Sequence, residues 1–399
     1  MDGLRAPSFS SIQNSVFGKA ELVSRALPEI ASKNGVAVYF SRLGTPTYAH
    51  EKATLSRVAE LIGEIRGIDS HNNRKRPYSD SIFFVPDDAL MLDEALRLGI
   101  LDENGLYGGV VPYPFVKTKV ITHDLVSDAS ARPDGWSCSF ARATQDVVLP
   151  GYTVFSVEDA RNAAKHLLML GAIRVKEPLG AGGYGHSIIT TYNELAQFIE
   201  IYSPEKVATC GLVLETNLQP VLTRSVGQIT IGGAMLAYYG TQRTVINNRG
   251  QAVYGGSDII CVRGGWDALE RLPKDPEAQL AVAQARTYDL AAGKYPAFFA
   301  SRRNYDVGQG IDGQGCWRSG ALEASWRSGG ASTAELSAML AFARNPALQV
   351  FKASAVKVFG KLEKVPQGAI VHFQDNDPAD GPIARYTNLT KGSLDQLTA

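Results

Sequence analysis

The sequence has few cysteines and no long apolar run, and each absence excludes a class of protein. The 399 residues include four cysteines that form no C-x-x-C pair: Cys138, Cys210, Cys261 and Cys316. This spacing argues against a zinc site and is typical of reduced thiols in the cytosol. No stretch approaches the ~20 apolar residues that span a bilayer, and the N-terminus has no apolar core of signal-peptide length. We therefore expect a soluble, cytoplasmic protein without a membrane partner.

The chain also lacks net charge, because forty basic residues balance forty acidic ones. A neutral chain has no general attraction for nucleic acid or for an anionic membrane, so any anion must be held by a local site. The proportions of hydrophobic and charged residues, 45% and 20%, are those of an ordinary globular protein. The length allows two or three domains. We expect no nucleic-acid partner.

Strand-like and helix-like patterns alternate in the N-terminal part of the chain. Short apolar runs predict strands at 36–42, 81–86 and 108–115, and apolar residues at helical spacing predict helices at 53–65 and 90–99. Such alternation is typical of a small parallel α/β layer. This part carries no phosphate-binding fingerprint of its own.

The middle of the chain continues this alternation around a glycine-rich segment. Strands are predicted at 172–178, 186–191 and 212–218. Ser156 and Thr191 each have an acidic residue three positions later, so each is expected to cap the start of a helix.

Four glycines occupy six positions between two of these strands: Gly180, Gly182, Gly183 and Gly185. Glycine allows backbone N–H groups to approach phosphates closely, and Lys176 on the preceding strand would add an ammonium nearby. The segment is not a Walker loop, because no GK[ST] follows, and a strand rather than a helix comes next. Taken alone, it fits either a phosphate-binding hairpin or an ordinary glycine-rich surface hairpin.

A second segment, residues 303–330, is expected to form a strand, a turn and a returning strand. Asp312, followed by glycine, suits the turn. Asp306 lies on the first strand and Glu323 on the second, and acids on adjacent antiparallel strands can converge on one cation. Magnesium prefers one or two carboxylates together with substrate phosphates.

Ser325 and Arg327 follow Glu323 at intervals of two residues. Alternate residues of a strand share a face, so these three side chains are expected to lie side by side. The alternative is a solvated outer face of a sheet, where polar residues also alternate.

Together these features resemble the ATP-grasp superfamily, in their order as well as in their residue types. The segment from Glu323 to Arg327, EASWR, is similar to the E-x-N-x-R strand that ligates magnesium in that superfamily. Glu215, in LETNL and 39 residues after Lys176, is similar to the acidic segment that cradles adenine. Two longer stretches, GGVVPYPFVKTKVITH and LEASWRSGGASTAE, are similar to an uncharacterised bacterial family sometimes labelled biotin-carboxylase-like.

The resemblance implies an α/β (α+β) chain with an ATP-grasp fold of two α+β lobes preceded by a small parallel α/β domain. Residues 1–115 would form the N-terminal α/β domain, and residues 116–218 the small lobe and lid. Residues 219–345 would form the large lobe with the metal site. Residues 346–399 would form a C-terminal segment packed on the large lobe.

By the same resemblance, Lys176 contacts the α- and β-phosphates of ATP and the glycine-rich loop covers them. A second lysine often assists, and Lys119 is the candidate we commit to, with Lys117 as the alternative. Adenine and ribose would be held, largely through the backbone, by three residues: Glu215, Thr216 and Leu218.

The implied metal ligands are Asp306, Glu323 and Ser325, with Glu323 bridging two magnesium ions and Arg327 neutralising the transferring phosphate. Ser325 replaces the usual asparagine with a single neutral oxygen. Two residues are candidates for the first acidic ligand of the metal. Asp306 suits the strand, whereas Asp312 lies 11 residues before Glu323, nearer the usual spacing. We prefer Asp306.

The resemblance implies an ATP- and Mg²⁺-dependent ligase that joins a small-molecule carboxylate to an amine or thiol through an acyl phosphate. One alternative is biotin-carboxylase-type activation of bicarbonate. Another is a catalytically degenerate nucleotide-binding scaffold, which Ser325 makes conceivable. A homodimer is left open. Arg243, in the polar segment 241–257, is a candidate for gripping a carboxylate or phosphate in two-point contact, the alternative being a solvated loop.

Two weaker features complete the prediction. His123 and His186 flank the phosphate-binding elements, although a lone histidine is more often structural. Ser332 and Glu335 have the spacing of a capping box. The two glycines before Ser332 would then either offer N–H groups to an anion or serve an ordinary helix start.

Overall fold

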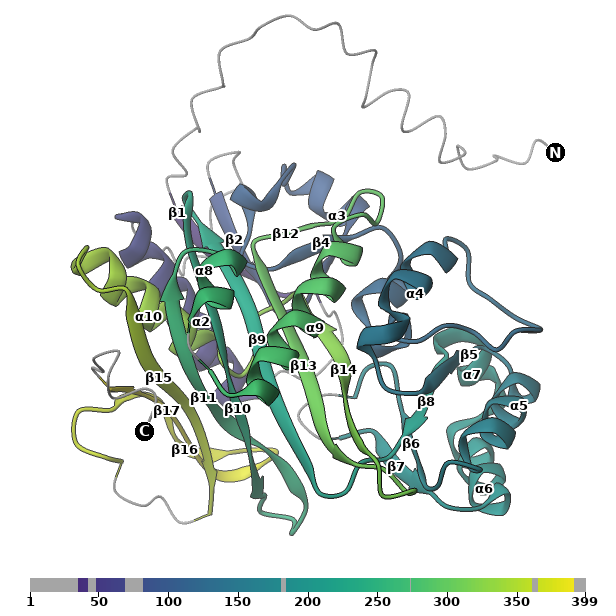
Figure 1. Cartoon of the computed structure of the whole chain (residues 1–399). Helices are drawn as coiled ribbons and strands as arrows, with labels where there is room; N and C mark the ends of the chain where they lie inside the picture. The colour runs from purple at the N-terminus through teal and green to yellow at the C-terminus, as the bar shows by residue number, and fades with distance from the viewer. Residues whose placement is uncertain are drawn as a thin grey trace, which may run out of the picture. The chain divides into compact units, whose positions relative to one another are not determined.

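The computed structural model describes residues 35–41, 48–68, 82–180, 184–272, 274–360 and 365–390. Within these ranges the chain forms four sheets, connected by α-helices and short 3-10 helices (Figure 1). Gly182 and Gly183 of the predicted loop lie outside the described residues, as does the end of the strand predicted at 36–42. In the described part, no helix is both long and apolar enough to cross a membrane.

The predicted N-terminal parallel layer is present. β1 (Gly35–Tyr39) pairs in parallel with β2 (Ile82–Pro86), and α2 (Ala49–Arg66), predicted at 53–65, packs against both strands. Parallel strands need a long connection between them, and the segment containing α2 supplies it.

A second small sheet follows directly. β3 (Leu90–Met91) pairs in parallel with β4 (Gly109–Val111), which pairs antiparallel with β12 (Phe299–Ala300). α3 (Leu92–Arg97) is shorter than the helix predicted at 90–99, because the first two residues of that range pair with β4 instead. Three 3-10 helices come next along the chain: η1 (Glu103–Gly105), η2 (Pro114–Lys117) and η3 (Lys119–Ile121).

The glycine-rich segment belongs to an antiparallel sheet with the strand order β5-β8-β6-β7. Its strands are β5 (Gly151–Val154), β6 (Ile173–Lys176), β7 (His186–Ile189) and β8 (Leu212–Thr216). The helices of this part are α4 (Cys138–Thr144), η4 (Gln145–Val147), α5 (Val157–Leu167), α6 (Tyr192–Tyr202) and α7 (Pro204–Cys210). As predicted, the side chains of Ser156 and Thr191 cap α5 and α6.

The largest sheet has eight antiparallel strands in the order β14-β13-β9-β10-β11-β15-β17-β16. The first five along the chain are β9 (Val221–Ile231), β10 (Ala234–Ile246), β11 (Ala252–Arg263), β13 (Arg302–Ile311) and β14 (Trp317–Ser325). The last three are β15 (Val350–Phe359), β16 (Ile370–Asp377) and β17 (Gly381–Thr390). The strands after residue 346 thus continue the same sheet.

Helices cover both faces of the eight-stranded sheet. α8 (Trp266–Arg271) and α9 (Pro276–Ala292) pack on one face, and α10 (Ser332–Arg344) and α2 pack on the other (Figure 1). Neighbouring residues of β10 show the alternation: Tyr239 lies in the hydrophobic cluster with residues of α9, and Tyr238 lies in the cluster with residues of α10. The candidate site described below is on the α10 face.

A buried ion pair joins α10 to this sheet. Arg302 and Glu335 are almost fully buried and lie 2.7 Å apart, and the hydroxyls of Tyr107 and Tyr238 donate to the same carboxylate. The capping box predicted for Ser332 and Glu335 is therefore wrong. α10 starts at Ser332 without a side-chain cap, because the Glu335 carboxylate neutralises Arg302.

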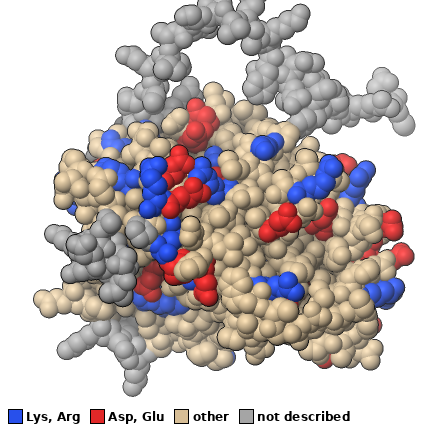
Figure 2. Space-filling view, viewed as in Figure 1, with Lys and Arg blue, Asp and Glu red and all other residues tan. Residues whose placement is uncertain are grey.

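Charged side chains of both signs are interspersed on the face shown in Figure 2, in agreement with the balanced composition. On this face, a ligand with several negative charges would therefore depend on local groups rather than on a broad basic surface.

Candidate functional site

Lys176, at the end of β6, is buried and anchored by two acceptors. Its Nζ lies 2.5 Å from Oε1 of Glu215 on β8 and donates to the carbonyl of Leu322 on β14 at 3.2 Å. An ammonium has three donors, so one remains for a further acceptor. The second contact brings the small sheet of the glycine-rich segment against the strand that carries Glu323.

Glu215 is held as a carboxylate at the centre of this arrangement. Nε2 of His123 contacts Oε2 of Glu215 at 2.9 Å, whereas Lys176 contacts Oε1. Burial opposes ionisation, but Lys176 and His123 together lower the pKa of Glu215 to about 2. The side chain of this predicted adenine-segment residue thus serves Lys176, and its backbone lies in a strand paired with β5 on one side and β6 on the other.

Lys119 occupies a matching position on η3. Its Nζ lies 3.0 Å from Oε2 of Glu323 and 2.7 Å from Nε2 of His186 on β7. Burial, together with Lys119, lowers the pKa of His186 to about 3, so its ring is neutral and accepts the hydrogen bond from the lysine. Lys117, the alternative second lysine, instead lies 3.3 Å from Asp88.

The two predicted acids of the hairpin face each other across it. Asp306 on β13 is the register partner of Glu323 on β14, with a bulge immediately after this pair. Burial and the charge of Glu323 raise the pKa of Asp306 to about 7. For Glu323, burial is outweighed by Lys119 and Lys176, which hold its pKa below the ordinary value.

Asp312, the alternative first acid, is committed to the turn. Its carboxylate accepts the backbone N–H groups of Gln314 and Cys316 and the Nε–H of Arg318, the last at 2.7 Å. The hairpin therefore brings Asp306, and not Asp312, to Glu323.

The acids at this position suit a magnesium ion bound to nucleotide phosphates. Oδ1 of Asp306 is buried and has no hydrogen-bond partner among the described residues. An unpartnered buried carboxylate oxygen is costly unless a cation completes it. Within the described segments, no group of three or more His, Cys, Asp or Glu side chains converges as a metal site. An ion would thus take two carboxylates from the chain and the remaining ligands from phosphate and water.

Ser325 lies on the same strand as Glu323, two residues further on, whereas Arg327 lies beyond the end of that strand. β14 ends at Ser325, and buried Trp326 follows, so the strand alternation predicted through Arg327 stops short of it. Arg327 instead reaches towards the N-terminal layer, with its Nε 3.8 Å from Asp88. It stays about one-third exposed and able to contact a ligand.

Arg243 is not brought to these residues. It forms a two-point ion pair with Asp258, and both side chains are about two-fifths exposed. Its neighbour Gln242 lies on the other face of β10 and hydrogen-bonds Asp306. Gln242 was missed at the sequence level, because nothing in the sequence shows which of two adjacent polar residues faces the acid.

The glycine-rich hairpin closes through a close backbone contact. A Cβ built on Gly180 would lie 2.4 Å from the carbonyl oxygen of Tyr184, and Gly185 has a φ of +72°, which side chains disfavour. Thr216 and Leu218, the remaining predicted nucleotide contacts, are buried beside this sheet, and the Thr216 hydroxyl has no partner among the described residues.

The arrangement of sheets is that of an ATP-grasp-like fold and confirms the predicted fold class. The chain belongs to the family described as "Protein of unknown function (DUF3182)", whose model matches residues 38–387. No curated protein matches the chain in sequence.

Solved structures share the architecture at low sequence identity. Pyruvate carboxylase from Rhizobium etli matches with a TM-score of 0.51 and 10% identity, over 92% of this chain and 37% of that chain. Biotin carboxylase from Campylobacter jejuni matches with a TM-score of 0.47 and 11% identity, over 90% and 87%. N5-carboxyaminoimidazole synthetase from Staphylococcus aureus matches with a TM-score of 0.46 and 12% identity, over 92% and 95%. At such identities the likeness concerns the fold alone.

Proposed function

We propose that this protein is an ATP- and Mg²⁺-dependent ligase that joins a small-molecule carboxylate to an amine or thiol through an acyl phosphate. One observation carries the proposal. The lysine beside the glycine-rich hairpin, Lys176, donates to the backbone of β14 at Leu322, next to Glu323, while Lys119 binds Glu323 itself. Phosphate-binding donors and metal-binding acids therefore meet at one point, as phosphoryl transfer requires.

The reaction would proceed in two steps. A carboxylate oxygen of the substrate attacks the γ-phosphorus of ATP, the bond to the β-phosphate oxygen breaks, and ADP leaves. The amine or thiol then attacks the carbonyl carbon of the acyl phosphate, inorganic phosphate leaves, and the proton of the nucleophile passes to solvent or to the released phosphate.

The chain's own residues act mainly by positioning and by neutralising charge. Lys176 and Lys119 would each offer one unused N–H donor to the polyphosphate, and Arg327, about one-third exposed, would be the cation available to the transferred group. Magnesium, when bound at Asp306 and Glu323, would neutralise the phosphates further.

The test is magnesium-dependent release of ADP from ATP in the presence of a pool of small carboxylic acids, with hydroxylamine added to trap an acyl phosphate as a hydroxamate. We expect turnover and trapping by the wild-type protein and loss of most of both in Glu323→Gln. Asp267→Asn, at an exposed acid of α8, is the matched control. Turnover that requires bicarbonate and gives no hydroxamate would favour the carboxylase alternative. No turnover with any acid, despite ATP binding, would favour a scaffold.

A further inference from the structure

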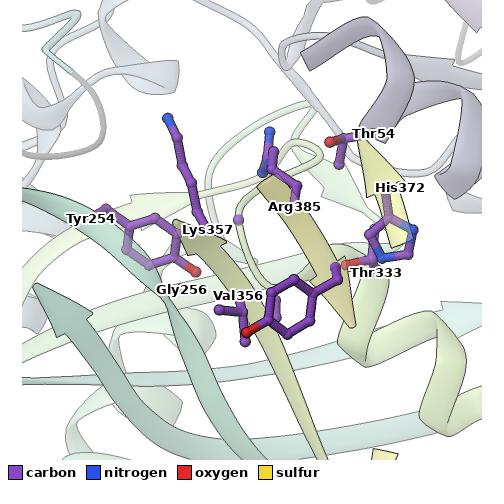
Figure 3. Close-up of a pocket in the computed structure, with 11 residues that line it drawn as sticks. Thr54, Tyr254, Gly256, Thr333, Val356, Lys357, His372 and Arg385 are labelled. Carbon is purple, nitrogen blue, oxygen red and sulfur yellow. The ribbon is translucent and has the colours of Figure 1, made fainter. Parts of the chain in front are cut away.

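A separate pocket lies on the α10 face of the eight-stranded sheet, where β15 and β17 approach the start of α10. Polar side chains line much of it, and Figure 3 shows those of Lys357 and Arg385 rising from neighbouring strands with their nitrogen ends pointing the same way. Tyr254, Thr54, Thr333 and His372 contribute further polar groups to the lining.

The two cations of this pocket are direct neighbours. Lys357 on β15 and Arg385 on β17 are register partners in an antiparallel pair, so both project from one face of the sheet. Like charges directly opposite each other are destabilising, and here they are also sheltered from water. Burial, with the charge of Arg385 adding to it, lowers the pKa of Lys357 to about 8.

The neighbouring carboxylates do not fully neutralise this pair. Asp380 lies 3.9 Å from Nζ of Lys357 and also contacts His50. The Asp377 carboxylate accepts the backbone N–H group of His50. It also accepts those of Ala379 and Asp380, in the turn that follows Asp377. Among the described residues, no Asp or Glu lies within ion-pair distance of Arg385. Glu51 acts on it from a longer range, and its guanidinium donates to Nδ1 of His50 at 3.3 Å.

The histidines around the pocket add no compensating charge. Burial lowers the pKa of both His50 and His372 to about 4, and Arg385 contributes to each shift, so both rings are neutral near pH 7. Thr333 lies in the first turn of α10, where the helix end carries partial positive charge. The pocket thus presents two cations, neutral rings and the start of a helix, with the carboxylates of Asp380, Asp377 and Glu51 as the negative charges that act on them.

One lining residue of the pocket also interacts electrostatically with an acid of the predicted metal site. Tyr254 forms a wall of it, and its ring packs against Gly330, where a Cβ would lie 2.3 Å from the ring. Burial raises the pKa of Tyr254, Asp306 raises it further, and Arg385 lowers it, which places this phenol within electrostatic range of both groups.

We propose that this pocket binds an oxyanion, a carboxylate or phosphate group, that the substrate carries in addition to the carboxylate to be activated. This inference rests on the proposed ligase function and narrows its substrate class to acids with a second anionic group. The guanidinium of Arg385 matches the planar geometry of two oxyanion oxygens, and Lys357 supplies a point charge beside it. An anion between them would also relieve their mutual repulsion.

The experiment measures binding of inorganic phosphate and of acetate, in separate titrations, to the full-length protein without nucleotide. We expect one of the two anions to bind to the wild type and to raise its melting temperature. The titration that shows binding identifies whether the pocket takes a phosphate or a carboxylate group. Arg385→Gln and Lys357→Met should each weaken that binding ~10-fold or more, the scale of a charge-assisted hydrogen bond. The control is Lys352→Met, on β15 but on its opposite face, and it should bind like the wild type.

These measurements test the proposed pocket separately from the proposed ligase activity. Equal anion affinity in the wild type and both variants, or no binding of either anion, would overturn the proposed pocket. Circular dichroism would show whether each variant is still folded. Arg385→Lys keeps the positive charge and is therefore the conservative variant at this position. It should retain more affinity than Arg385→Gln. ATP affinity should be unchanged in all these variants. Anion binding that follows Arg385 in a protein without ATP turnover would keep the pocket and contradict the ligase.

Discussion

Nζ of Lys176 on β6 and Oε1 of Glu215 on β8 lie 2.5 Å apart, and both side chains are almost fully buried. Each charge is tolerable there only because the other is present, since a lone buried ion costs several kcal/mol. The pair is completed by His123 on one side and by the β14 backbone on the other. A lysine fixed in this way keeps a defined direction for its unused donor and is pre-organised to bind an anion.

Replacing Lys176 by alanine should weaken ATP binding by about 1.5–3 kcal/mol, because one charge-assisted hydrogen bond to phosphate is lost. The same change should lower the free energy of unfolding by about 3–5 kcal/mol, because Glu215 is left buried without its partner. Calorimetric titration with ATP and urea unfolding measure the two effects. Lys165→Ala, at an exposed lysine of α5, is the control. Wild-type ATP affinity in Lys176→Ala would rule out the assigned role.

Asp306→Asn should abolish most magnesium-dependent turnover, because one of the two facing carboxylates is removed. It should also raise the melting temperature slightly at pH 8, where the wild type must hold Asp306 ionised opposite Glu323. Asp312→Asn should instead keep most turnover and destabilise the hairpin, because its carboxylate accepts turn N–H groups and Arg318.

Turnover assays and thermal melts of the two variants separate these assignments. If Asp312→Asn were the more damaging to turnover while remaining folded, Asp312 would be the metal ligand and the hairpin register would not describe the active state.

Local patterns were enough to predict the pieces of the site. The β13-β14 hairpin follows from alternating residues around an Asp-Gly turn, and this fixes the strands on which Asp306 and Glu323 lie. The start of α5 follows from Ser156, whose hydroxyl has one nearby N–H group to accept. Such features depend on residues a few positions apart, and a single sequence contains that information.

The contacts between the pieces could not be predicted in the same way. Glu215 turned out to neutralise Lys176 from the adjacent strand, and Glu335 turned out to neutralise Arg302 from a helix, which removed it from the expected capping box. Gln242, and not its neighbour Arg243, contacts Asp306, because the face that a strand residue occupies depends on register, which is set by long-range pairing. Neither the composition nor the residue spacing of the chain shows which distant residues form such pairs.

The buried Arg302–Glu335 pair gives a prediction about stability. Glu335→Gln should lower the free energy of unfolding by about 3–5 kcal/mol, because Arg302 would keep its charge in a dry interior without a counter-ion. Urea unfolding monitored by circular dichroism measures this. Glu194→Gln, at the exposed start of α6, should change the unfolding free energy far less. Equal effects in the two variants would show that Arg302 is neutralised in another way.

His186 gives a prediction about pH. Burial and the nearby Lys119 and Lys176 lower its pKa from 6.5 to about 3, whereas Glu323 has the opposite effect and Arg174 a small lowering one. The unfolded chain therefore takes up a proton near pH 6.5 that the folded chain takes up only near pH 3. Stability from this histidine is complete above pH 6.5 and is lost as the pH falls. Between pH 6.5 and 5 the loss amounts to about 2 kcal/mol.

His186→Gln should accordingly flatten the pH dependence of the unfolding free energy by about 2 kcal/mol between pH 7 and pH 5. Glutamine can still accept the hydrogen bond from Lys119 through its amide oxygen but cannot take up a proton in this range. Relative to the wild type, the variant should therefore gain about 2 kcal/mol of stability between pH 7 and pH 5. Urea unfolding at several pH values gives both curves. His166→Gln, at an exposed position of α5, should leave the wild-type curve unchanged. Parallel curves for His186→Gln and the wild type would mean that His186 is already protonated in the folded chain, and its contact with Lys119 would then have to be broken.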